Sequence, residues 1–367
     1  MKKVLTKIRI PLTALCMTAM LACGCADTQY VLTPEINLEE VFAAGESVGT
    51  LSELRVMADA LCLSYAKAYS DKVMHGSYRD DIASAIPENA LADLTKTKVL
   101  SQMAAENGVV LSEAEQALAL QAAEALYGGL AENEKTFCFG GKDEEQCLEL
   151  LRGMYAEYAA AQKMYDSIME NAAVEVSDEE ARTVTVQSIL IKTYDVDPYG
   201  NHIPYDDAGK AEARRRAAAI LQEIRDGMAG YTGVSFDTWI SRYNEAGTGT
   251  DTFGKGERDS AYEQAAFTQE PGTIGEVVET ADGYRIIKVI RGSDADEIRE
   301  KKEAITKLRQ TQAFESAYND YLRGVPYVLD DEAYASFSEE VGSYYDGFSK
   351  EEESLTFFEV YDWVFHG

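Results

Sequence analysis

The chain has 367 residues, a formal net charge of −30 and a hydrophobic content of 46%. The hydrophobic content predicts a folded protein, and the length is enough for two domains with cores of their own. A surface this negative excludes nucleic acid and polybasic membrane contacts, because both depend on Lys and Arg side chains that meet phosphates or anionic lipids.

Residues 1–25 have the pattern of an export signal. Positive charges up to Arg9 precede a mostly apolar stretch over residues 10–21, which is too short to span a bilayer. Cys23 and Cys25 then follow small residues, an arrangement that resembles a lipobox. We predict lipidation of Cys25, with Cys23 as the alternative, and an ordinary secretory signal is the competing interpretation. Since no later segment is long and apolar enough for a membrane helix, lipid would be the only anchor, at the outer face of the cell membrane.

The remaining cysteines of the exported chain are Cys62, Cys138 and Cys147. Export permits disulfides, and Cys138 and Cys147 are close enough in sequence to pair with each other. Three buried free thiols are the alternative, and the sequence leaves both open. The three histidines are scattered and no metal-ligand spacing is present, so we predict no metal site.

Residues 26–40 predict a flexible tether, and residues 41–182 predict a mostly helical module. Capping boxes at Thr50, Ser112 and Ser177 mark three helix starts, because each has a Glu three residues later. A short hairpin is expected at 41–48, and helices are expected at 50–70, 80–107, 112–127 and 144–171, with a short one from 177.

The pattern changes at residue 183, where β-branched residues alternate with polar ones. Strands are expected at 184–191, 277–278 and 284–290, helices at 209–228, 236–243 and 262–267, and loops at 194–207 and 244–256. A charged helix over 294–323 follows, with an apolar stripe that includes Ile305 and Leu308 and must pack on something. The acidic, aromatic tail over 331–367 either packs on the helical module or stays mobile, and composition does not decide between the two.

Short motifs follow one another in a fixed order between residues 183 and 292. They include Val186-Gln187-Ser188-Ile189-Leu190-Ile191, Phe253-Gly254-Lys255-Gly256, Ala265-Ala266-Phe267, Pro271-Gly272-Thr273-Ile274 and, as the most specific, Gly283-Tyr284-Arg285-Ile286-Ile287-Lys288. In order and spacing these motifs resemble a parvulin-type (PpiC) peptidyl-prolyl isomerase domain. The export signal, the helices before this domain and the long helix after it resemble the extracytoplasmic foldases of the PrsA and SurA type.

The resemblance implies an α+β fold in which both ends of the chain build one helical chaperone module. The parvulin-like domain, a small antiparallel sheet wrapped by helices at residues 183–292, would be inserted into this module. Residues 293–330 would hold the return helix, and residues 331–367 the tail. The implied partners are unfolded or partly folded exported polypeptides, and no cofactor is implied.

The resemblance also points to the site, where this chain departs from the family pattern. Active parvulins usually carry one histidine in the first strand and one in the last motif, and this chain has Ser188 and Arg285 there. Glu245 lies beside the position of the usual Cys or Asp. The candidate catalytic positions are therefore Ser188, Arg285 and Glu245. The candidate substrate-binding positions are Arg258, Tyr262, Phe267, Thr280 and Tyr284.

These replacements change the chemistry of the site. Arg285 is always charged, so it must reach water or a carboxylate, for which Glu245, Asp282 and Glu279 are candidates. Arg258 makes the proline pocket more polar. We therefore expect a foldase or chaperone whose isomerase activity is weak or lost. The alternatives are a fully active isomerase and a non-catalytic surface-binding lipoprotein on a parvulin scaffold.

Overall fold

The computed structural model describes residues 39–367 except residues 75, 173, 230–233 and 349–353. The predicted signal sequence, both candidate lipidation sites Cys23 and Cys25, and most of the predicted tether lie outside the described residues. The chain divides into two compact units, Met1–Ala172 with Gln312–Gly367, and Ala173–Thr311. The fold is α+β, as predicted from the sequence.

The first unit is mostly helical. Its capping boxes at Thr50 and Ser112 are present. Each hydroxyl accepts the backbone N–H of the Glu three residues later, and the carboxylate of that Glu accepts the backbone N–H of the capping residue. The sequence missed the short helix α5 and the strand β9. The elements of this unit are β1 (Glu40–Ala44), β2 (Ser47–Thr50), α1 (Leu51–Ala68), α2 (Asp71–Met74), α3 (Arg79–Glu106), α4 (Glu113–Gly129), α5 (Glu132–Phe139), α6 (Glu144–Asn171), β9 (Tyr327–Leu329), α12 (Asp331–Asp346) and α13 (Phe357–His366).

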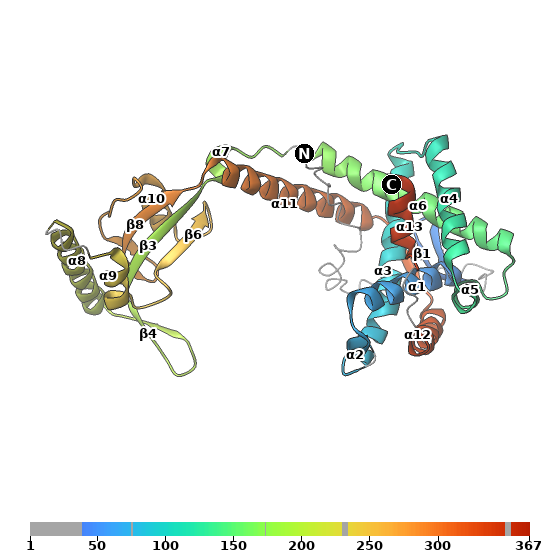
Figure 1. The fold of residues 1–367 in the computed structure, drawn as a ribbon, viewed down its shortest axis with the longest axis horizontal. Helices are drawn as coiled ribbons and strands as arrows, with labels where there is room; N and C mark the ends of the chain where they lie inside the picture. The colour runs from blue at the N-terminus through green and yellow to red at the C-terminus, as the bar shows by residue number, and fades with distance from the viewer. Residues whose placement is uncertain (1–38, 75, 173, 230–233, 349–353) are drawn as a thin grey trace. The chain divides into compact units, whose positions relative to one another are not determined.

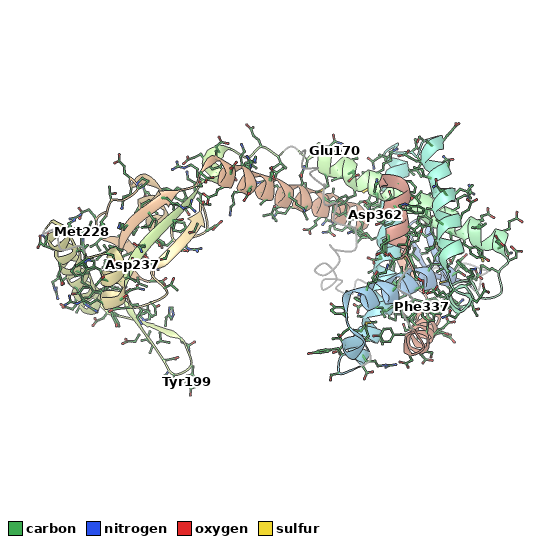
Figure 2. The ribbon with its side chains drawn as sticks, viewed as in Figure 1. Glu170, Tyr199, Met228, Asp237, Phe337 and Asp362 are labelled. Carbon is green, nitrogen blue, oxygen red and sulfur yellow. The ribbon has the colours of Figure 1, made fainter. Side chains whose placement is uncertain are left out.

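Both ends of the described chain contribute to the core of this unit. Strand β9 pairs antiparallel with β1, with Phe42 opposite Leu329, which completes a sheet in the order β2-β1-β9. In the tail, Phe337 of α12 (Figure 2) and Phe357 of α13 are buried in the same hydrophobic core as α1 and α6. The Phe357 ring stacks on Tyr155 with a centroid distance of 4.2 Å. The described part of the tail therefore packs on the helical module, which was one of the two alternatives.

The three cysteines that the structure describes are free thiols. Cys62, Cys138 and Cys147 are all buried, and the pairing of Cys138 with Cys147 that we considered does not occur. Cys138 lies on α5, whereas Cys147 lies in the first turns of α6 and directs its thiol toward the carbonyl of Lys142 at 3.8 Å. Each thiol thus serves as a small apolar side chain.

The second unit is built on a four-stranded antiparallel sheet in the order β6-β3-β8-β7, of which β6, β3 and β8 are labelled in Figure 1. Helices α8 and α9 cover one face of this sheet, and α10 covers the other. The elements are α7 (Asp178–Ala181), β3 (Thr183–Lys192), β4 (Tyr194–Val196), β5 (His202–Pro204), α8 (Asp207–Ala229), α9 (Phe236–Tyr243), β6 (Thr250–Gly254), α10 (Ser260–Thr268), β7 (Val278–Thr280) and β8 (Gly283–Gly292).

Two of the predicted loops contain strands instead. The loop predicted at 244–256 holds β6, which pairs along β3 with Val184 opposite Phe253. The loop predicted at 194–207 holds the hairpin of β4 and β5, with Tyr199 at its tip (Figure 2). The side chain of Asp197 closes this tip by accepting the N–H groups of Tyr199 and Asn201, each at 2.8 Å.

Helix α11 (Ala295–Leu322) contributes residues to both units. Its predicted apolar stripe is only partly right, since Leu308 is 57% exposed and the buried residue is Phe314. The half before residue 312 is held to the second unit by ion pairs, such as Lys302 with Asp178 at 2.7 Å. This ion pair joins α11 to α7, which lies just before β3. No helix among the described residues has the length and apolar character needed to cross a membrane.

Candidate active site

The pleat of β3 and β8 brings Ser188 and Arg285 to the same face of the sheet. Side chains alternate along a strand, so Val186 and Ser188 of β3 face α10, while Ile189 packs under α8 and α9. In the pairing of the two strands, Ser188 lies opposite Ile287 and Leu190 opposite Arg285. The two positions that the sequence selected from distant motifs are therefore brought together.

Ser188, Tyr262 and Arg285 form what we call the polar centre of this face. The hydroxyl oxygen of Ser188 lies 3.4 Å from both the Tyr262 hydroxyl and the Nη1 of Arg285. The guanidinium carbon of Arg285 lies 4.7 Å from the centroid of the Tyr262 ring. Ser188 and Tyr262 are 5% and 3% exposed. Burial raises the pKa of Tyr262, so its hydroxyl keeps its proton and remains a donor.

Arg258, the second cation at the site, is fully paired. Its Nε and Nη2 each donate to a different carboxylate oxygen of Asp251 at 2.8 Å, which is a bidentate ion pair. The hydrogen bonds from Arg258 lower the pKa of Asp251 and keep it ionised. The sequence had placed Asp251 in a loop, and no local pattern links it to Arg258 across the six residues between them.

Phe267 belongs to an aromatic group beside the polar centre. Phe253 lies between the other two rings, 5.1 Å from Tyr262 and 6.1 Å from Phe267. Each ring has a cation near it: Arg258 at 5.4 Å from Phe253, Arg285 over Tyr262, and Lys255 at 5.7 Å from Phe267. Apolar and cationic groups therefore alternate over this face.

Glu245 is not a partner of Arg285, contrary to one of the options that the sequence left open. Its carboxylate accepts the Lys192 backbone N–H at 2.7 Å and forms an ion pair with Arg216. Of the three carboxylates considered for Arg285, Asp282 approaches it, with 4.0 Å between Oδ2 and Nη2.

Of two further candidates, Tyr284 lies away from the polar centre and Thr280 has a hydrogen-bond partner outside it. Tyr284 is 6% exposed and belongs to the core under α8 and α9, on the opposite face of the sheet. Thr280 donates from its hydroxyl to the Gly283 carbonyl at 2.9 Å and so closes the turn between β7 and β8. In the part of the chain that the structure describes, no group of three His, Cys, Asp or Glu side chains is placed to hold a metal ion.

The comparison with protein families agrees with this architecture. Residues 189–291 match the family model described as Rotamase: PPIC-type PPIASE domain. The second unit thus contains a domain of the parvulin-type peptidyl-prolyl isomerase family. Among curated proteins, no sequence matches the chain significantly.

Several solved structures are similar to this chain at low identity. PrsA from Bacillus cereus is 18% identical, with 78% of this chain and 92% of that one covered and a TM-score of 0.30. The foldase protein PrsA from Streptococcus pneumoniae is 15% identical, with 79% and 94% covered and a TM-score of 0.24. A PpiC-type peptidyl-prolyl cis-trans isomerase domain is 16% identical over 32% of this chain and 96% of that one, with a TM-score of 0.25. At these scores the structural likeness carries no argument about function.

Proposed function

We propose that the protein is an extracytoplasmic foldase that binds unfolded exported polypeptides and whose PPIC-type domain has weak or no isomerase activity. The observation that carries this proposal is the polar centre of Ser188, Tyr262 and Arg285 in place of a histidine pair. An isomerase must lower a barrier of about 18–20 kcal/mol, which arises from amide resonance. It does so with an apolar pocket for the proline ring and fixed polar groups that favour the twisted amide.

The aromatic face of the site supports a weakened isomerase. A proline ring that packs on Tyr262 or Phe267 must displace the Arg285 or Lys255 cation, which lie 4.7 and 5.7 Å from the ring centroids. A cation–π contact of this kind contributes about 0.5–1 kcal/mol at an exposed site and more when it is desolvated. Substrate binding therefore starts with a cost that an apolar pocket would not have.

The helical unit offers a surface for an extended polypeptide. A groove of about 390 Å³ lies between α3, α4 and α6, lined by small apolar residues such as Ala105, Ala156 and Ala160. Val110 at its edge is 71% exposed. Small side chains leave room for the side chains of a bound segment, and an open groove accepts segments of different sequence. This geometry supports binding of unfolded chains without strong sequence preference.

The proposed location rests on the N-terminal sequence. The predicted export signal and the lipobox-like Cys25 support a mature chain outside the cytoplasmic membrane with a lipid as its anchor. Exported polypeptides that emerge unfolded at this membrane are then the partners within reach.

The proposal is tested with the full chain in two assays. We expect it to suppress aggregation of a chemically denatured secreted protein and to leave the protease-coupled isomerisation of a proline tetrapeptide near its uncatalysed rate. Val110→Glu places a charge in the groove and is expected to reduce the suppression. Val328→Glu is the matched control, since Val328 is 64% exposed on β9 and does not line the groove. An isomerisation rate like that of an active parvulin, or equal suppression by the two variants, would overturn the proposal.

A further inference from the structure

Arg285 differs from the other cations of the site in how it is paired. Arg258 has two hydrogen bonds of 2.8 Å to one carboxylate, and Lys255 and Arg182 both contact Glu179. Arg285, by contrast, has a 3.4 Å contact with the Ser188 hydroxyl and an approach of 4.0 Å to Asp282. Among Arg182, Lys255, Arg258 and Arg285, it is the cation with no carboxylate oxygen closer than 4.0 Å.

This shortage of partners is unusual for its surroundings. A guanidinium has five N–H donors, and the side chain of Arg285 is only 20% exposed, so water cannot satisfy all of them freely. The chain has 64 acidic residues against 34 Lys and Arg, so carboxylates are plentiful. Besides Asp282, the carboxylates around α10 have other partners: Asp251 pairs with Arg258, Asp259 accepts the Ala281 N–H, and Glu263 accepts the Gly256 N–H.

The orientation of Arg285 suits a ligand that approaches along the aromatic group. Its guanidinium carbon lies 4.7 Å from the centroid of the Tyr262 ring, which holds the cation beside the aromatic group. A planar, fixed fork of N–H donors matches a carboxylate, with which it forms two parallel hydrogen bonds. Phe253 is 1% exposed and belongs to the core, so the partly buried Phe267 is the ring that offers apolar contact for the rest of a bound segment.

We propose that Arg285 is a specificity-determining residue that binds the carboxylate of a peptide held at this site, so that the domain selects segments with Asp or Glu beside proline. The inference rests on the proposed function in that the domain contacts polypeptides, but it does not depend on catalysis. The same chemistry could come from the carboxylate at a peptide's C-terminus, and the test separates these two sources.

The test measures binding of dye-labelled tetrapeptides to the full chain by fluorescence anisotropy. Three peptides carry Glu, Ala or Lys before proline and have an amidated C-terminus, and a fourth carries Ala with a free C-terminus. We expect the Glu peptide to bind about tenfold more tightly than the amidated Ala peptide, and the Lys peptide to bind more weakly than either. Equal affinities for the three amidated peptides, or no measurable binding of any, would overturn the proposal. Tighter binding of the free C-terminus than of the Glu peptide would overturn its assignment to acidic side chains.

Two variants assign the effect to this side chain. Arg285→Gln is expected to remove the preference for Glu while the chain stays folded by circular dichroism. Arg225→Gln is the matched control, because it removes the same charge from α8, where Arg225 pairs with Glu276 at 2.7 Å. If Arg285→Gln does not fold, the peptide series on the unmodified chain still decides. Loss of the preference in both variants would overturn the proposal. Failure of the peptide test leaves the aggregation assay unaffected, so the two proposals can fail separately.

Discussion

Replacing Asp59 by Asn is predicted to stabilise the helical unit at neutral and higher pH. Asp59 lies on α1, is 6% exposed and accepts a 2.6 Å hydrogen bond from the Tyr344 hydroxyl on α12. Burial raises its pKa from 3.8 to about 7, and the charge of Glu134 adds to this effect. An ionised Asp59 is therefore a cost in the folded state, whereas Asn keeps the size and the acceptor without the charge.

The magnitude and the sign follow from the pKa. Between pH 4 and 7 the folded state keeps a proton that the unfolded state has released, so stability falls as the pH rises through this window. A shift of about three pKa units corresponds to about 4 kcal/mol when the pH exceeds the folded value. The amide N–H of Asn would be buried without a partner, which lowers the gain in unfolding free energy by about 1 kcal/mol. We expect Asp59→Asn to be more stable than the original chain by about 3 kcal/mol at pH 8.

Urea unfolding followed by circular dichroism at several pH values measures this difference. The original chain should lose stability from pH 4 to 8, and Asp59→Asn should show a flatter dependence. Asp81→Asn, at an exposed position on α3, controls for the loss of one charge. The gain in unfolding free energy of Asp59→Asn over the original chain should be larger at pH 8 than at pH 4. If this gain is the same at the two pH values, the reasoning about the buried carboxylate is wrong.

Three further predictions concern the site and the helical core. The double variant Ser188→His with Arg285→His should raise the protease-coupled isomerisation rate about tenfold or more, because neutral imidazoles replace a charged centre. An unchanged rate would show that other residues limit activity. Phe357→Ala should lower the free energy of unfolding by about 3–5 kcal/mol in urea, because the ring is 1% exposed and stacked on Tyr155. Lys98→Met should cost about 3–5 kcal/mol in the same assay, since Lys98 bridges two glutamates at 2.6 and 2.7 Å and its loss leaves buried charge unpaired.

The elements that the sequence predicted well are those with local signals. The capping boxes at Thr50 and Ser112 depend on residues three positions apart, and both helix starts were placed correctly. The strand at 184–191 was recognised because β-branched residues alternate along it, and the structure extends it by one residue at each end.

The elements that were missed depend on distant partners. Strand β9 has three residues and forms because it pairs with β1, whose residue Phe42 lies opposite Leu329 despite their distance in the sequence. Strand β6 lies in a Gly- and Thr-rich segment whose composition predicts a loop, and it forms a strand because it pairs with β3. In the same way, the bidentate pair of Asp251 with Arg258 and the engagement of Glu245 by Arg216 are properties of the folded sheet. Family motifs brought Ser188 and Arg285 to attention, but residue types alone could not say which carboxylate would be near them.

Refolding of a secreted client whose slow phase is limited by proline isomerisation tests most directly whether this chain assists folding without catalysing rotation. We predict that added full chain raises the yield of native client in proportion to its concentration while the rate constant of the slow phase stays unchanged. A slow phase that accelerates in proportion to the concentration of the chain, with no gain in yield, would contradict this.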